Sequence, residues 1–339
     1  MKFDKSHIEK ILVIKLRAIG DVLLSTIVVP NLRAAFPNAK IDFLTENPAR
    51  DVVLGNTELD SVIVFNSKKQ NGINLILDVR KRKYDLVFDL FGNPRSALVT
   101  QFSGAKYRVG YRFGWRERCY NIVVEPRGGE VHNTEFNLDA LRAFDIPIVK
   151  KEICFPVSAE HDEFAKQFFS DMQLTNSFVV AMNVAGGWYT KRWGLPKFAQ
   201  LANQIVEKHN AKIVLLWGPG ERDEAERIKA LMAHDALLIP PTTLPQLAAI
   251  LKQCTILVTN DSGPMHIAAS VGTPTVSIFG PTNPMLQGPF GNKAEVIRNE
   301  QLTCLTCNYT KCPIGNPCME ELQVEDVMNA FERLRAKVG

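Results

Sequence analysis

Residues 255–284 read TILVTNDSGPMHIAASVGTPTVSIFGPTNP, and this stretch decides the fold. Its apolar runs at Thr255–Thr259 and Pro274–Phe279 predict two short strands, and Pro264–Val271 between them predicts a short helix. A β-α-β unit of this length is typical of a parallel sheet covered by helices. We therefore expect an α/β protein whose chemistry lies on the loops that follow its strands.

The same alternation continues from this stretch toward both ends of the chain. In the second half, strands are expected at 178–184 and 212–217 and helices at 196–208, 221–233 and 324–337. In the first half, strands are expected at 11–16, 40–44, 61–65 and 84–90 and helices at 22–36, 72–82 and 133–144. A hinge near 145–156 separates the two series. The pattern predicts two facing Rossmann-like domains with a cleft between the carboxyl ends of their sheets.

Composition sets the broad class of protein and excludes others. With 339 residues, 46% hydrophobic and 22% charged, this is an ordinary globular chain, and its net charge of +4 is too mild for an obligate nucleic-acid binder. Residues 1–150 hold 23 Lys/Arg against 17 Asp/Glu, whereas residues 151–339 hold 17 against 19. The two halves are therefore expected to meet different partners. Neither a membrane-spanning segment nor a signal peptide is predicted, so the expected location is the cytoplasm.

The first motif is RAIGD at Arg17–Asp21, directly after the first expected strand. Gly20 permits a tight turn from strand to helix, and Asp21 lies near the first helical turn. The motif is not a dinucleotide fingerprint, which needs three spaced glycines. Asp21 is either a helix cap that accepts backbone N–H bonds or a carboxylate general base.

The second motif is GGWYTKRW at 186–193, after the first strand of the second series. Its two glycines permit close backbone approach, and Lys191 and Arg192 supply a point charge and a guanidinium fork. Such a loop suits a monophosphate or diphosphate. The alternative is a solvated basic turn anchored by its two tryptophans.

The third motif is NDSGPMH at 260–266. Ser262 or Asp261 is a good N-cap for a helix that begins at the end of a strand, which is a ready anion site. Asp261 could also accept hydrogen bonds from sugar hydroxyls. His266 is either part of this site or a buried core or cap histidine. The loop at 280–284 is expected to face the same edge.

Two further clusters leave more than one interpretation open. In KYRVGYRFGWRER at 106–118, cations alternate with aromatics, which suits RNA, an anionic carbohydrate or a phosphorylated lipid surface. It equally suits an amphipathic strand and loop whose cations reach solvent, and no RNA-binding signature accompanies it. Near the end, Cys304, Cys307, Cys312 and Cys318 could hold a structural zinc ion or remain reduced thiols; disulfides are less expected.

Taken together, three segments resemble glycosyltransferase family 9, whose best-known members are the lipopolysaccharide heptosyltransferases. They are Val13–Leu24 (VIKLRAIGDVLL), Lys191–Trp193 (KRW) and Val258–Pro284. The resemblance extends over about residues 11–335 and is closer to enzymes that add the second or a later heptose than to those that add the first. A departure is Gly194, where many members have proline.

The resemblance implies a GT-B architecture and an inverting transfer of heptose from ADP-heptose, with no cofactor or catalytic metal required. The implied acceptor is an anionic, lipid-linked oligosaccharide, the inner core of lipopolysaccharide, met at the cytoplasmic face of the inner membrane. Residues 1–150 would bind the acceptor, with the last helix, about 322–337, packing back on them, and residues 157–321 would bind the donor. The alternatives are a transferase or epimerase that uses another sugar nucleotide, or an inactive carbohydrate-binding relative.

The resemblance also assigns roles to residues. Asp21 looks like the base that deprotonates the acceptor hydroxyl, and Lys191 looks like the cation that neutralises the departing diphosphate. The implied donor-binding residues are Thr190, Arg192, Glu221, Asp261, Ser262, Gly263 and His266. The basic first half would contact the acceptor through Arg17, Gly20, Arg108, Arg112 and Arg116.

Overall fold

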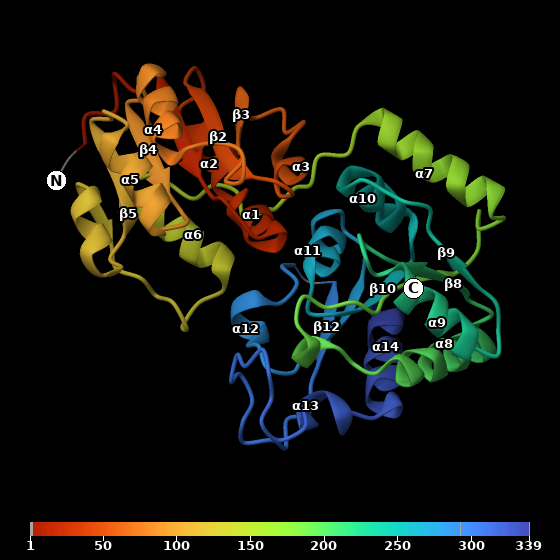
Figure 1. Ribbon diagram of the computed structural model, residues 1–339. Coiled ribbons are helices and arrows are strands. Elements are labelled where there is room, and N and C mark those ends of the chain that lie inside the picture. The colour runs from red at the N-terminus through yellow and green to blue at the C-terminus, as the bar shows by residue number, and fades with distance from the viewer. Residues whose placement is uncertain (1–2, 292, 339) are drawn as a thin grey trace. The chain divides into compact units, whose positions relative to one another are not determined.

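The computed structural model describes residues 3–291 and 293–338, and the chain divides into two compact units between Pro156 and Val157. Each unit is a parallel β-sheet with helices along its connections (Figure 1). Within the described residues, no helix is both long enough and apolar enough to cross a bilayer.

The first unit contains a six-stranded sheet in the order β3-β2-β1-β4-β5-β6. Its strands are β1 (Lys10–Ile14), β2 (Lys40–Glu46), β3 (Ser61–Phe65), β4 (Leu86–Asp89), β5 (Tyr107–Tyr111) and β6 (Ile122–Val124). Its helices are α1 (Ile19–Ser25), α2 (Val28–Ala35), α3 (Arg50–Val53), α4 (Gly72–Lys81), α5 (Pro94–Phe102) and α6 (Asn133–Arg142), with a 3-10 turn at Gly114–Cys119. Leu75 and Val79 of α4 and Val99 of α5 pack in one core with Leu12 and Ile14 of β1. These two helices therefore cover the same face of the sheet.

The second unit repeats this plan, with the order β12-β11-β10-β7-β8-β9. Its strands are β7 (Val179–Asn183), β8 (Lys212–Leu216), β9 (Ala236–Leu238), β10 (Ile256–Asn260), β11 (Thr275–Ile278) and β12 (Ala294–Ile297). Its helices are α7 (Ala159–Asp171), α8 (Leu195–His209), α9 (Arg222–Leu231), α10 (Leu244–Gln253), α11 (Gly263–Ser270), α12 (Pro284–Gln287), α13 (Pro317–Glu320) and α14 (Val324–Val338), with a 3-10 turn at Tyr189–Lys191. Numbered from its own first strand, this sheet has the same strand order as the first.

Both sheets therefore have the doubly wound order 3-2-1-4-5-6. In this order the connections leave the first strand in one direction and the fourth strand in the other, and ligands bind where the direction changes, beyond the carboxyl ends of these two strands. The switch points are the ends of β1 and β4 in the first unit and of β7 and β10 in the second.

The helix predicted over 22–36 is two helices, α1 and α2, in the structure. Pro30 lies in the first turn of α2, where its missing N–H costs no helical hydrogen bond. In one continuous helix, Pro30 would remove the bond to Thr26 and its ring would clash with that carbonyl. A break before Val28 avoids both penalties.

The last helix, α14, packs within the second unit. The contacts of α14 that define its place are with β12, β11 and α8, all in the second unit. Its apolar stripe, which includes Val327, Phe331 and Leu334, belongs to the same core as Phe198 and Leu201 of α8. The helix therefore completes the cover of the second sheet.

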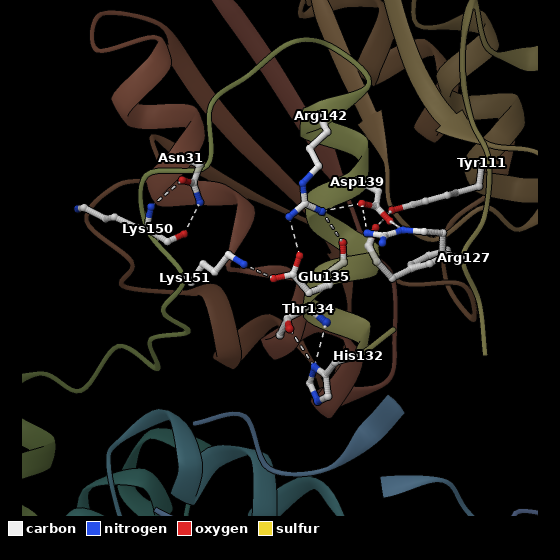
Figure 2. Close-up of polar contacts among 11 residues, drawn as sticks. Asn31, Tyr111, Arg127, His132, Thr134, Glu135, Asp139, Arg142, Lys150 and Lys151 are labelled. Carbon is white, nitrogen blue, oxygen red and sulfur yellow. Dashed lines mark hydrogen bonds and ion pairs between the residues drawn. The ribbon is translucent and has the colours of Figure 1, made fainter. Parts of the chain in front are cut away.

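A polar network holds the end of the first unit in place, as Figure 2 shows. Asn31, which is fully buried, accepts hydrogen bonds from the N–H groups of Val149 and Lys150 and donates to the Lys150 carbonyl. On α6, Glu135 pairs with Lys151 at 2.6 Å and with Arg142 at 2.5 Å. The chain is therefore fixed to the first unit as far as Lys151, within the segment where a hinge was predicted.

Candidate active site

An ion pair lies at the switch point of the second sheet. Lys191 ends the short turn that follows β7, and Asp261 directly follows β10. Their Nζ and Oδ2 atoms are 2.6 Å apart, and the two side chains are only 13% and 5% exposed. The Lys191 ammonium also lies 4.6 Å from the centre of the Trp188 ring. Lys191 and Asp261, to which the sequence analysis assigned separate roles, thus form an ion pair with each other.

Thr282 joins this pair from a third strand end. It lies on the loop after β11, is 1% exposed, and donates a 2.6 Å hydrogen bond to the same Oδ2 atom of Asp261. The sequence indicated the loop at 280–284 but not this residue. Its signal is a hydroxyl four residues after a buried strand and two residues past a glycine. Three loops therefore converge on the Asp261 carboxylate.

Two buried amides at strand ends support these loops. Asn183, the last residue of β7, donates to the Ser262 hydroxyl at 2.9 Å. Asn260, the last residue of β10, accepts from the Trp193 N–H at 3.1 Å and donates to the Val184 carbonyl at 2.7 Å. Sequence reasoning did not assign these roles, although an amide ending an apolar strand is a usable signal. Together they fix the 186–193 loop and the start of α11.

The remaining donor-site candidates lie at the same edge, and each has an internal partner. Thr190, which is buried, donates to the Tyr309 carbonyl at 2.7 Å. Arg192 donates a 3.0 Å hydrogen bond from Nε to the Gly186 carbonyl and forms a 2.5 Å ion pair with Glu224. The Glu221 carboxylate accepts from the Gly218 N–H at 2.9 Å. These contacts orient the side chains.

The start of α11 supplies backbone donors beside Asp261. Ser262 is its N-cap residue and Gly263 its first residue, so the first N–H groups of this helix have no partner within the helix. The partial positive charge there favours an anion. His266 lies inside α11 and is buried.

In the first unit, Asp21 lies at the third position of α1, just beyond the end of β1. Its Oδ2 atom accepts a 3.3 Å hydrogen bond from the Ala18 N–H, and the residue is exposed. Within the described residues, no hydrogen bond reaches its Oδ1 atom. Asp21 therefore helps to cap the helix and still presents a carboxylate oxygen to solvent. Gly20 and the exposed Arg17 flank it.

Two charged residues near Asp21 were not predicted as site residues from the sequence. Lys15 donates to the Leu90 carbonyl at 2.9 Å, and burial lowers its pKa against the opposing effect of Asp21 and Asp89. Asp89 ends β4, and burial raises its pKa, although Gly92 N–H and Tyr120 hydroxyl bonds act the other way. A lysine next to the apolar run ILVI was the available signal for Lys15. Both residues mark the switch point of the first sheet.

The arginines predicted for the acceptor have different places in the structure. Arg108 lies in the amino-terminal half of β5 and donates to the Ala105 and Cys119 carbonyls. Arg112 follows the carboxyl end of β5 and pairs with two carboxylates, at 2.6 and 2.7 Å. Arg116, in the Gly114–Cys119 turn, donates to the Phe113 carbonyl at 2.8 Å. Arg112 and Arg116 thus follow β5 on the side of the Asp21 edge, whereas Arg108 lies toward the other edge.

The four clustered cysteines are free thiols. Burial, together with the neighbouring Cys307, Cys304 and Cys312, raises the pKa of Cys318 to about 11, so the four lie near one another. In residues 3–291 and 293–338, however, no group of three or more His, Cys, Asp or Glu side chains has the geometry to hold a metal ion. This arrangement gives the zinc interpretation no support.

Two Rossmann-type units with charged residues at both switch points define the class of this protein: an α/β enzyme built like the GT-B glycosyltransferases. The model of glycosyltransferase family 9 (heptosyltransferase) matches residues 73–317, and the chain belongs to this family.

Known proteins similar to this chain agree. Lipopolysaccharide heptosyltransferase 3 of Escherichia coli is 25% identical over 291 residues, which cover 80% of this chain and 84% of that protein. The crystal structure of a family 9 glycosyl transferase from Veillonella parvula DSM 2008 has a TM-score of 0.87 at 24% identity and covers 99% of both chains. The structure of E. coli ADP-heptose lps heptosyltransferase II has a TM-score of 0.78 at 23% identity, over 97% of this chain and 99% of that one. The predicted α/β GT-B fold and the family are therefore confirmed.

Proposed function

We propose that this enzyme moves a heptosyl group from ADP-heptose to the inner core of lipopolysaccharide, with inversion at the anomeric carbon. The observation that carries the proposal is the buried Lys191–Asp261–Thr282 cluster at the switch point of the second sheet, beside the start of α11. The names of the E. coli relatives, heptosyltransferase 3 and ADP-heptose heptosyltransferase II, support the donor and favour a second or later heptose as the one added.

On the donor side, the bond between the anomeric carbon and the diphosphate oxygen breaks, and negative charge grows on the diphosphate. The Lys191 ammonium has three N–H donors, so it can keep its bond to Asp261 while it donates to the diphosphate. The first N–H groups of α11 stabilise the same charge. Asp261 uses Oδ2 for Lys191 and Thr282, so Oδ1 is the oxygen that accepts from a sugar hydroxyl. Lysine and helix dipole supply the positive charge that this step needs.

On the acceptor side, the acceptor hydroxyl oxygen forms the new bond to the anomeric carbon from the face opposite the diphosphate. Its proton goes to Asp21, whose exposed carboxylate has one oxygen committed to the Ala18 N–H. Arg17, Arg112 and Arg116 are the cations we assign to the anionic acceptor. Arg108 is better explained as a support for the β5–β6 edge, because carbonyl groups occupy its guanidinium.

The test is the substitution Asp21→Asn. An amide oxygen still accepts from the Ala18 N–H, so the helix cap survives, but the base is lost. We expect kcat for heptosyl transfer to fall by about 100-fold or more, while ADP-heptose affinity by isothermal titration stays within twofold. A matched control is Asp51→Asn, an acid in the first turn of α3, which should keep full activity. Wild-type kcat in Asp21→Asn would refute the assignment of Asp21 as base.

A further inference from the structure

The outward faces of α4 and α5 expose apolar side chains. Ile73 and Leu77 on α4 are 62% and 48% exposed, and Leu98 and Phe102 on α5 are 36% and 46% exposed. Each pair has i, i+4 spacing, so each forms a stripe along one helix face. The two helices are in contact, and Arg80 of α4 donates to the Phe102 carbonyl at 3.5 Å. Figure 1 shows the two helices side by side in the first unit. We call these four side chains the α4–α5 face.

Cations lie at both ends of this face. Residues 68–83 contain six Lys/Arg and a single acid, Asp78. Two of the cations precede α4 and the others end or follow it: Lys68, Lys69, Arg80, Lys81, Arg82 and Lys83. Among the described residues, only Arg82 of these six lies within ion-pair distance of a carboxylate, that of Asp42 at 3.5 Å. Most of the positive charge of this segment is thus not neutralised by ion pairs.

We propose that the α4–α5 face docks the enzyme on an anionic lipid bilayer. The four apolar side chains enter the boundary between headgroups and acyl chains, and the flanking cations contact lipid phosphates through their long stems. A protein partner fits less well, because the cores of protein interfaces are depleted in lysine, and four lysines border this face.

Docking along this face has a consequence for catalysis. Helix α4 follows the carboxyl end of β3, so Lys68 and Lys69 lie toward the same edge of the sheet as Asp21. A bilayer along α4 and α5 would therefore run beside the edge where we place the acceptor. This point rests on the proposed function, whereas docking itself does not require transfer.

The experiment measures co-sedimentation of the full-length protein with vesicles. One set contains phosphatidylglycerol and phosphatidylethanolamine, and the other contains only phosphatidylcholine. We expect binding to the anionic set, weakened by salt, and at least tenfold lower affinity for two variants. They are Ile73→Gln/Leu77→Gln/Phe102→Gln and Lys68→Gln/Lys69→Gln/Lys81→Gln/Lys83→Gln.

The control Met172→Gln/Leu231→Gln removes two side chains that are 44% and 52% exposed in the second unit, and should bind like wild type.

Several outcomes would overturn the proposal. They are no binding by wild type, equal binding to both vesicle sets, or binding by the variants that matches wild type. Loss of self-association in place of vesicle binding would assign the face to a second copy of the chain. Transfer to a soluble acceptor is measured in parallel and should not change in the variants. Vesicle binding without any transfer would refute the proposed function and leave the docking surface standing.

Discussion

At the scale of single residues, the sequence identified Lys191 and Asp261 because both lie on loops directly after apolar strands. It could not show that they pair with each other, because they are 70 residues apart and the contact depends on side-chain conformation. The contact of Thr282 with Asp261 was not predicted for the same reason. Asp21 was found, but its bond to the Ala18 N–H makes it both a cap and an exposed carboxylate. The two interpretations offered for it therefore do not exclude each other.

The Lys191–Asp261 pair makes a prediction about stability. In Lys191→Met the buried Asp261 carboxylate keeps, among the described residues, only Thr282 as a side-chain partner, so we expect the free energy of unfolding to fall by about 3 kcal/mol. The double variant Lys191→Met/Asp261→Asn should lose less than the two single losses combined. Urea unfolding measures all three. The control is Lys229→Met, which breaks an exposed pair with Asp235 and should cost about 1 kcal/mol or less. Equal losses for Lys191→Met and Lys229→Met would contradict this account.

At the scale of elements, strands were predicted where an apolar run is unbroken. The expected 61–65 strand is β3, with the same bounds, and the expected 212–217 strand is β8 with one residue fewer. Strand β5 was not in the predicted series, because Arg108 and Gly110 interrupt its apolar pattern. Glycine is required at position 110 by tertiary packing, because a Cβ there would lie 2.4 Å from the Tyr120 ring. Such a close approach cannot be seen in the sequence, because it depends on where the chain places Tyr120.

The contact between α8 and α14 predicts a pH dependence. Burial alone would raise the pKa of Glu332, but hydrogen bonds from Lys208, Arg335 and His209 lower it to about 2. A carboxyl with a lowered folded-state pKa stabilises the protein above its unfolded value, near 4.5, and this contribution is lost as pH falls toward 2. We expect Glu332→Gln to cost about 1 kcal/mol at pH 7, because the pair network is solvent-accessible.

Urea unfolding of wild type and Glu332→Gln from pH 7 to pH 2 checks this. The difference in free energy of unfolding should shrink below about pH 4.5. The control is Glu163→Gln, which removes one exposed partner of Lys166 and should change the free energy little at any pH. A constant difference between wild type and Glu332→Gln down to pH 2 would refute the role of the ionised carboxylate.

At the scale of the whole molecule, the sequence predicted two βα series and an uneven charge, and both are present. The shared strand order of the two sheets was not predictable, since strand neighbours depend on crossover connections that composition does not reveal. The charge was assigned to residues 106–118. In the structure Arg112 there is paired with carboxylates, and a further group of cations, of which only Arg82 has an ion pair among the described residues, lies at 68–83. The first unit therefore has a second basic segment, at 68–83, that a reading of motifs alone did not find.

The central claim is heptosyl transfer from ADP-heptose, and the mass of the product tests it most directly. The purified protein is incubated with ADP-heptose and defined inner-core acceptors, and the acceptor is analysed by mass spectrometry. We predict an acceptor heavier by one heptosyl residue, released ADP in equal amount, and formation of both products slowed by about 100-fold or more in Asp21→Asn. An unchanged acceptor with ADP-heptose, together with sugar transfer from a UDP- or GDP-linked donor, would contradict the account.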